Sequence, residues 1–287
     1  MAAGRGARYG GAKQLDEVGP SGETLLDYAV FDARLAGFSR IVIVTRADLA
    51  PALEAHIRRF PSDLDVRCAV QPSVMPGGAV SRTRPWGTVH AVLAAGAGDR
   101  RTLVALNADD FYGRATYELA RVASDWAIAT GEASVIAMRL DATLSEHGAV
   151  VRAVCQATGD RLTGLDEIRG ITRTGGGIVG YASDGRPRAL IGDELVSMNM
   201  WVLPPGLVRA LETLFKRFVV THAQDDDAEL PLPEAIGALV ASGTATVNVE
   251  SSDGPWFGLT HPQDRDAVVR ALTQLTAEGV YPVPLWT

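Results

Sequence analysis

The sequence predicts a doubly wound, Rossmann-like α/β fold with a mostly parallel sheet and a smaller β-rich lobe. Its 287 residues, of which 47% are hydrophobic, are enough to bury one large core. Helical and strand-like apolar patterns alternate as far as Met138, as they do in sheets covered by helices on both faces. After Met138 the period changes to short strands between glycine-rich turns, which indicates the second lobe.

The first half of the chain should supply the parallel sheet. Glu23–Gly37 has apolar residues at helical spacing and stops at a glycine, and the apolar run RIVIVT at Arg40–Thr45 follows it as a buried strand. The next predicted elements are a helix at Leu49–Phe60, a strand at Val66–Val70, a helix at Gly87–Ala97, a strand at Thr102–Asn107, a helix at Arg114–Thr130 and a strand at Ala133–Met138. Ser73–Arg84 is rich in Pro, Gly and Arg, so we expect an exposed loop beside a ligand cleft.

The second half should supply the β-rich lobe and the closing helices. Short strands are predicted near Ala149–Val154, Arg161–Leu165 and Val196–Leu203. Helices are predicted near Pro205–Val219, Pro233–Ser242 and Gln263–Gly279. No internal repeat interrupts this order, so we expect one domain over residues 1–287.

Charge and composition exclude several classes of protein. The net charge of -7 and the pI near 5.3 argue against a nucleic-acid surface, which needs a basic stripe. The sequence has no apolar run of membrane-spanning length and no signal peptide at its start, so we expect a cytoplasmic protein that makes no membrane contact. Cys68 and Cys155 lie in separate strand-like segments and are predicted to be buried free thiols.

The start of the chain, AAGRGARYGGAKQL at Ala2–Leu15, has the composition of a phosphate-binding loop. Its four glycines let the backbone approach a phosphate, and Arg8 and Lys13 add positive charge. Lys13 is one of only two lysines in the chain, and a compact ammonium suits a point contact with phosphate. The segment is neither a Walker A loop nor a dinucleotide fingerprint. The alternative is a flexible glycine-rich terminus.

The position of this loop is unusual. A phosphate-binding loop in an α/β sheet normally follows the first, central strand, whereas here the loop begins at Ala3. We therefore expect either a start upstream of Met1 or loss of that strand, and we predict that the chain alone is poorly stable.

Two further motifs fall at predicted strand ends. Gln71 is followed by PWGTVHA at Pro85–Ala91, where an amide and a glycine could meet a flat base, although Gly87 and Thr88 also read as an ordinary helix N-cap. LNADDFYG at Leu106–Gly113 places Asp109 and Asp110 where α/β folds build ligand sites. Mg²⁺ prefers carboxylate oxygens, but the same residues could also start a turn.

Polar residues also mark the β-rich lobe and the last loop. Gly148, Glu167 and Asn199 lie among its predicted strands, and an Asn inside an apolar strand needs a partner, which a ligand or a backbone group could supply. The later stretch from Glu250 to Asp264 contains Asp253. Its His261 is better explained as a helix cap or a packing residue than as a catalyst.

In their order along the chain, these motifs resemble those of the sugar-phosphate nucleotidyltransferases of the nucleotidyl transferase superfamily. The resemblance implies that Mg²⁺ binds at Asp109 and that the family's second metal aspartate falls in the column of Gly258, leaving Asp253 or Glu250 as its substitute. It also implies that the nucleotide lies against Ala3, Gly4 and Gly6 and that its base is bound by Gln71, Gly87 and Thr88. Arg8 and Lys13 would hold the phosphates and the outgoing pyrophosphate. The sugar would be bound by Gly148, Glu167 and Asn199.

The resemblance also implies a reaction and a division of labour. Residues 1–115 would bind the nucleotide, and residues 116–287 would bind the sugar phosphate. The enzyme would transfer NMP from an NTP to a sugar 1-phosphate, releasing pyrophosphate and forming an NDP-sugar. A phosphorylated alcohol such as phosphocholine could replace the sugar, and the oligomeric state is open. The alternatives are a metal-dependent glycosyltransferase and a non-catalytic nucleotide-sugar-binding protein.

Overall fold

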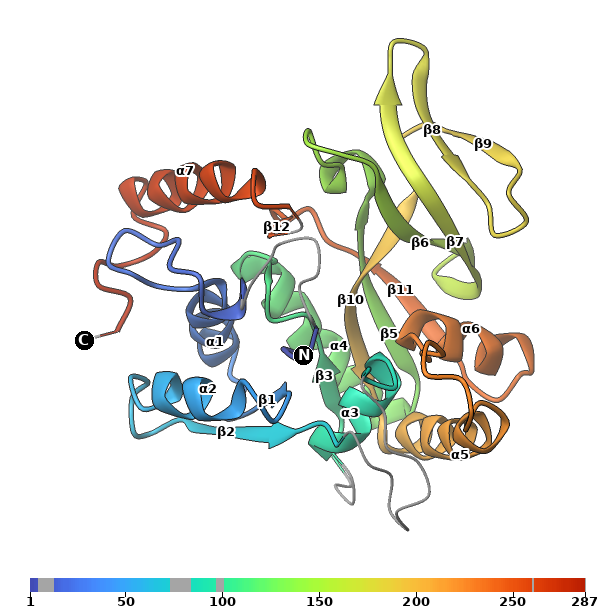
Figure 1. The fold of residues 1–287 in the computed structure, drawn as a ribbon, viewed down its shortest axis with the longest axis horizontal. Helices are drawn as coiled ribbons and strands as arrows, with labels where there is room; N and C mark the ends of the chain where they lie inside the picture. Colours follow the sequence, from blue (N-terminus) through green and yellow to red (C-terminus); the bar gives the residue numbers. More distant parts are fainter. Residues whose placement is uncertain (5–12, 73–83, 97–100, 260, 287) are drawn as a thin grey trace.

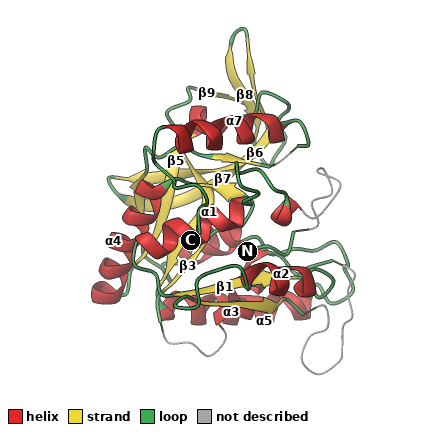
Figure 2. Ribbon diagram, turned by 90° about the vertical axis from the view of Figure 1, so that its left-hand side faces the viewer, coloured by secondary structure: helices red, strands yellow, loops and turns green. Residues whose placement is uncertain are grey.

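The computed structural model describes residues 1–4, 13–72, 84–96, 101–259 and 261–286 (Figure 1). Strands β1 (Arg40–Thr45) and β2 (Asp65–Val70) form a parallel pair, and a separate sheet of eight strands carries most of the chain. Seen from the side, the β1–β2 pair lies in the lower half with α2 (Ala50–Ile57) and α3 (Thr88–Gly96), and the β-rich lobe lies above (Figure 2). The predicted α/β fold with a second, β-rich lobe is confirmed.

The first half alternates helices and strands as the sequence predicted. The 3₁₀ turn η1 (Lys13–Leu15) precedes α1 (Leu25–Leu35), which begins at a capping box formed by Thr24 and Asp27. Beyond α2, β2 and α3, the chain forms β3 (Leu103–Ala105), β4 (Asp110–Phe111), α4 (Arg114–Thr130) and β5 (Ala133–Arg139). β5 has six consecutive buried residues, as expected of a strand covered on both faces.

The second half forms the rest of the large sheet. Its elements are η2 (Leu140–Thr143), β6 (Val150–Thr158), β7 (Arg161–Thr174), β8 (Gly177–Tyr181), β9 (Pro187–Leu190), β10 (Leu195–Leu203), α5 (Pro205–Thr221), α6 (Leu232–Ala241), β11 (Val247–Ser251), β12 (Phe257–Gly258) and α7 (Asp264–Ala277). The sheet order is β11-β5-β10-β6-β7-β8-β9, with β3 paired to β10. β6 to β9 extend away from the helices as hairpins (Figure 1).

Strand directions are more mixed than the sequence analysis predicted. In the described chain, the parallel pairs are β1–β2 and β5–β11, whereas β10 runs antiparallel to β3, β5 and β6. The successive strands β6 to β9 also pair antiparallel, because short turns join them and a parallel pair needs a crossover connection. The prediction of a mostly parallel sheet is therefore corrected to a mixed sheet.

Two apolar cores flank the large sheet. Trp86, Trp201 and Leu211 belong to a core under α3, α5 and α6, and Met138 and Ile168 belong to a second core beside α4. Cys68 and Cys155 are free, as predicted, and both are half-buried. In the described ranges, no helix is long and apolar enough to cross a membrane.

Candidate active site

The acidic end of β3 meets the beginning of the chain. Lys13, in η1, forms an ion pair through its Nζ atom with Asp109 Oδ2 and donates to the carbonyl oxygen of Leu259 at 3.0 Å. Both charged side chains keep a small exposed fraction, 17% for Lys13 and 18% for Asp109, so the pair is not sealed inside the protein. The structure thus brings together the two groups that the sequence analysis placed around a triphosphate.

Asp110, next to this pair, is a buried carboxyl group. Its Oδ2 atom accepts from Asn107 Nδ2 at 2.9 Å and lies 3.4 Å from the Tyr112 hydroxyl oxygen. Burial, followed by the nearby charge of Asp109, raises the pKa of Asp110 to about 7. A buried carboxyl group and a partly exposed one therefore lie side by side where the chain passes from β3 to β4.

Gly258 is explained by its contact with Asp110. The two residues are opposite each other in the β4–β12 ladder, and a Cβ atom at Gly258 would overlap Asp110 Oδ1. The space that a side chain at position 258 would fill already holds the carboxyl group of Asp110. Position 258 has no aspartate, but the carboxyl group of Asp110 lies where a side chain at position 258 would begin.

A substitution at this glycine tests the contact. We expect Gly258→Ala to lower the free energy of unfolding by roughly 1–3 kcal/mol, because the added methyl group must displace Asp110. Gly206→Ala is the matched control, since a Cβ atom there meets nothing within 4 Å. Adding Asp110→Ala should recover much of the lost Tm, and a Gly258→Ala variant that melts like the wild type would contradict the contact.

Asn199 lies at a bulge in β10 that faces the same site. The register of β10 against β5 shifts between Ser197 and Met200, and Asn199 has a left-handed φ of 63°. Its Nδ2 atom is 3.5 Å from Asn107 Oδ1, and its buried Oδ1 has no hydrogen-bond partner among the described residues. An unpartnered oxygen in a strained residue is a candidate ligand contact.

The predicted base-binding residues lie together at the ends of β2 and α3. Gln71 is buried, and its Nε2 atom donates to the Gly87 carbonyl at 3.1 Å and lies 3.3 Å from His90 Nδ1. Burial lowers the pKa of His90 to about 4, so its ring is neutral at pH 7 and stacks on Phe215 with centroids 4.9 Å apart. The three groups form one polar cluster.

Gly87 and Thr88 also have structural roles. Gly87 has a φ of 94°, and a Cβ atom there would be 2.5 Å from the Leu230 carbonyl oxygen. The Thr88 hydroxyl accepts from the Leu232 backbone N–H at 2.7 Å, at the start of α6. Close packing of α3 against the 230–232 segment therefore requires both residues whether or not a base binds.

The other predicted site residues are less closely grouped. Ala3 is buried, and Gly4 is exposed with its carbonyl accepting from Arg46 at 2.8 Å. Gly148 faces His261, whose Nε2 atom would be 3.2 Å from an added Cβ. Glu167 is exposed and pairs with Arg169 at 2.6 Å, and Asp253 is exposed in the β11–β12 loop. Gly6, Arg8 and most of the Ser73–Arg84 loop lie outside the described residues.

Sequence reasoning missed three residues of this site. Asn107 and Tyr112 flank the two aspartates inside the quoted motif, and Tyr112 also donates to the Met198 carbonyl at 2.7 Å, which fixes the bulge of β10. A polar residue on each side of Asp-Asp was the available signal. Arg152 on β6 lies over the Trp256 ring, 5.1 Å from its centroid, and lowers the pKa of Asp110 slightly. No local pattern marked Arg152.

Comparisons with known proteins show what the chain is similar to. Residues 1–109 match the MobA-like NTP transferase domain family. The structure is similar to the UTP-bound UGPase of Acinetobacter baumannii, with a TM-score of 0.60 and 17% identity over 94% of this chain and 90% of that chain. It is similar to the inositol-1-phosphate CTP transferase of T. maritima, with a TM-score of 0.60 and 11% identity over 96% of this chain and 93% of that chain.

A third solved structure extends the likeness to another nucleotidyltransferase. It is a putative glucose-1-phosphate thymidylyltransferase from Bacillus anthracis, with a TM-score of 0.61 and 10% identity over 94% of this chain and 92% of that chain. No curated protein sequence matches the chain. Residues 1–109 are therefore similar to a MobA-like NTP transferase domain, the whole chain has the fold of these solved nucleotidyltransferases, and the resemblance drawn from its motifs is confirmed at that level.

Proposed function

We propose that this protein is a sugar-1-phosphate nucleotidyltransferase, which transfers NMP from an NTP to the phosphate of the acceptor and releases pyrophosphate. The observation that carries the proposal is the contact between Lys13 and Asp109, since it places an ammonium suited to a phosphate next to a carboxylate suited to a metal, after a strand of the sheet. The proteins named above support the substrate class, because a UTP-bound enzyme and two transferases of sugar or inositol phosphates share the fold.

The residues around Asp109 fit a Mg²⁺ ion. The donor set is the two adjacent carboxyl groups of Asp109 and Asp110, whose oxygens are hard donors of the kind Mg²⁺ prefers. Bound there, Mg²⁺ would neutralise charge on the phosphates of the nucleotide. Asp109 would hold it, with Asp110 beside it as the second carboxylate in place of the exposed Asp253.

The chain's own residues would then position the two substrates and neutralise the charge of their phosphates. The attacking oxygen belongs to a phosphate that is already an anion, so the reaction needs no base to create the nucleophile. Lys13 would leave Asp109 as the metal and nucleotide arrive, and would turn its ammonium to the phosphates. Arg8 would add charge at the departing pyrophosphate. Asp109 and Asp110 would thus serve the metal, and Lys13 the phosphate.

Specificity for the base and for the acceptor would come from two separate groups of polar residues. The cluster of Gln71, Gly87 and His90 would meet the edge of a pyrimidine base, since Gln71 can both donate and accept. Asn199 would contact the sugar phosphate through its free oxygen, with Gly148 and Glu167 further along the β-rich lobe. Residues 1–115 would bind the nucleotide, and residues 116–287 would bind the acceptor.

Pyrophosphate release tests the reaction. The purified chain should be mixed with each of the four common NTPs and with a set of sugar 1-phosphates and phosphocholine, in the presence of Mg²⁺. Release that needs one NTP and one acceptor together would support the proposal. A glycosyltransferase would release a nucleoside diphosphate from an NDP-sugar instead. A binding protein would raise its Tm with ligand and release nothing.

A further inference from the structure

The acceptor side of the proposed site needs a positive charge that the residues assigned to it do not supply. Gly148 offers only its backbone, Asn199 is neutral, and Glu167 is an anion. A phosphate monoester carries roughly 1.5 to 2 negative charges at pH 7, and in the proposed reaction it approaches both the NTP and the carboxyl groups of Asp109 and Asp110. A cation that faces these carboxyl groups from the β-rich lobe is therefore the group expected to bind it.

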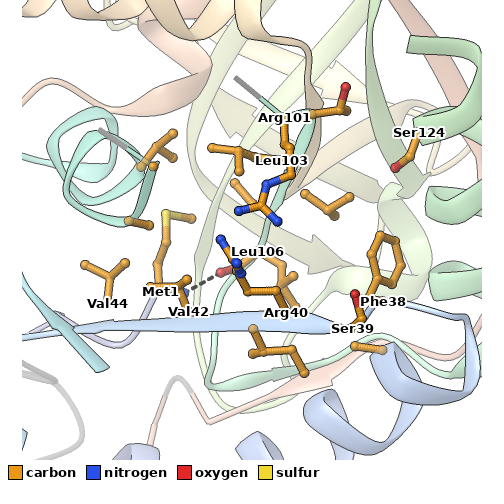
Figure 3. Close-up of a pocket in the computed structure, with 18 of the residues that line it drawn as sticks. Met1, Phe38, Ser39, Arg40, Val42, Val44, Arg101, Leu103, Leu106 and Ser124 are labelled. Atoms are coloured by element: carbon orange, nitrogen blue, oxygen red, sulfur yellow. Dashed lines mark hydrogen bonds between the residues drawn. The ribbon is translucent and has the colours of Figure 1, made fainter. Parts of the chain in front are cut away.

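Two arginines of the nucleotide-binding half lie in a different place. Arg40 and Arg101 line the large cavity between β1 and β3 (Figure 3). Arg40 is also paired with Asp65 at 2.8 Å. Both arginines belong to residues 1–115, whereas the acceptor is assigned to residues 116–287. The cation for the acceptor's phosphate should therefore come from the second of these ranges.

Arg152 on β6 lies at an unusual position for a charged residue. Val150 and Val154, two positions to either side of it, are buried, and Ile168, opposite it on β7, is fully buried. Side chains two positions apart point to the same face of a strand, so Arg152 leaves β6 on the side that carries the core. A charged residue is rarely placed there for packing alone, and this position therefore indicates a role for the guanidinium group.

Neutral oxygen atoms hold the guanidinium group of Arg152 in one orientation. Its Nε atom donates to the Thr143 hydroxyl at 3.1 Å, its Nη2 atom donates to the Thr143 carbonyl, and its Nη1 atom donates to the Val151 carbonyl at 2.9 Å. The group also lies over the ring of Trp256, 5.1 Å from the ring centroid. These contacts fix the plane of the guanidinium, and they leave its positive charge in place because the acceptors are uncharged.

Trp256 links Arg152 to the buried Asp110. The edge of the Trp256 ring lies 3.3 Å from the position of a Cβ atom at Gly258, and the same position overlaps the Asp110 carboxyl group. Burial raises the pKa of Asp110 to about 7, and the charges of Lys13 and Arg152 limit that rise. Lys13 from η1 and Arg152 from β6 therefore act on one carboxyl group from the two halves of the chain.

We propose that Arg152 binds the phosphate group of the acceptor, a sugar 1-phosphate or another phosphate monoester, and holds it against the NTP. This assignment rests on the proposed function. A planar guanidinium can bind two phosphate oxygens at once, which a compact ammonium cannot do. The third oxygen would then form a bond to the α-phosphorus as the bond from that phosphorus to the β-phosphate oxygen breaks, and pyrophosphate would leave with the electron pair. Lys13 would face the NTP in this arrangement, and Arg152 would face the acceptor.

Kinetics of Arg152→Gln test the assignment, with the NTP and acceptor that give pyrophosphate release. The amide can keep a contact with Thr143 but removes the charge, so KM for the acceptor should rise at least about tenfold while KM for the NTP stays within about twofold. Arg152→Lys keeps the charge and should recover part of the loss. Arg186→Gln is the matched control, because Arg186 is an exposed arginine of the β8–β9 turn that pairs with Asp184 at 2.5 Å, and its loss should change neither KM.

A binding experiment without turnover separates this assignment from the proposed reaction. The Nε–H signal of Arg152 in a nitrogen-edited NMR spectrum is identified by its absence from the Arg152→Lys spectrum. Methyl phosphate, glucose 1-phosphate and phosphocholine should each shift this signal in the wild-type chain, and methyl glucoside, which has no phosphate, should leave it in place. If no pair of NTP and acceptor releases pyrophosphate while methyl phosphate shifts the signal, the reaction is wrong and the phosphate site is supported.

Two results would overturn the assignment. One is an Arg152 signal that none of the three phosphate esters shifts. The other is an equal rise of both KM values in Arg152→Gln together with a lower Tm, since that is the effect of an arginine that only supports η2 through Thr143. The NMR titration of the wild-type chain decides the question even if Arg152→Gln does not fold.

Discussion

Asp109→Asn should lower kcat for pyrophosphate release by at least about 100-fold and leave Tm within a few degrees of the wild type. Asp109 is the carboxylate at the end of β3 that contacts Lys13, and its partly exposed side chain tolerates an amide of the same shape. The amide keeps the volume but loses the charge that would hold Mg²⁺. Binding of Mg²⁺, followed by calorimetric titration, should weaken by a similar factor.

The matched control for this variant is Asp125→Asn. Asp125 is an exposed aspartate on α4 that pairs with Arg121 at 2.9 Å, and its loss should change neither kcat nor Mg²⁺ binding. Asp253→Asn is informative as well, because a loss of Mg²⁺ affinity equal to that of Asp109→Asn would move the second metal ligand from Asp110 to Asp253. Wild-type turnover by Asp109→Asn would remove the metal assignment at the end of β3.

The sequence was sufficient for the parts of the fold that local patterns determine. Arg40–Thr45 was predicted with the bounds of β1, and the helix predicted at Arg114–Thr130 is α4, because a run of apolar residues or an amphipathic period is visible within one window. Asp109 was found in the same way, since it follows an apolar strand directly. Strand directions depend on which strands pair, and no window of sequence contains that information.

The parts of the site that were missed depend on long-range contacts. Gly258 looked like the loss of a metal ligand, but the β4–β12 ladder places it against Asp110, which is 148 positions earlier in the chain. Gly87 was interpreted as a base-reading glycine, and the structure adds a packing role, because a Cβ atom there would overlap the backbone of Leu230. A single sequence shows that a glycine is present. Only the pairing of distant segments shows which atoms require it.

Lys13→Ala should also lower kcat by at least about 100-fold, but it should change Mg²⁺ binding in the opposite direction from Asp109→Asn. Lys13 is the cation that occupies Asp109 in this structure, so it competes with a metal for the same carboxylate. Its removal should strengthen Mg²⁺ binding in the absence of nucleotide, while turnover falls because the ammonium no longer reaches the phosphates. Lys13→Arg should restore little, since a planar guanidinium cannot replace a compact ammonium in this narrow contact.

Lys216→Ala is the natural control, because Lys216 is the other lysine of the chain and is exposed on α5, where it pairs with Glu212 at 2.7 Å. It should leave kcat and Mg²⁺ binding unchanged. The opposite shifts in Mg²⁺ affinity separate a direct competition at Asp109 from a general disturbance of the site, because unfolding or a displaced loop would weaken metal binding in both variants. If Lys13→Ala binds Mg²⁺ less tightly than the wild type, the ion pair supports the carboxylate and does not compete for it, and the exchange of ammonium for metal proposed for the reaction is wrong.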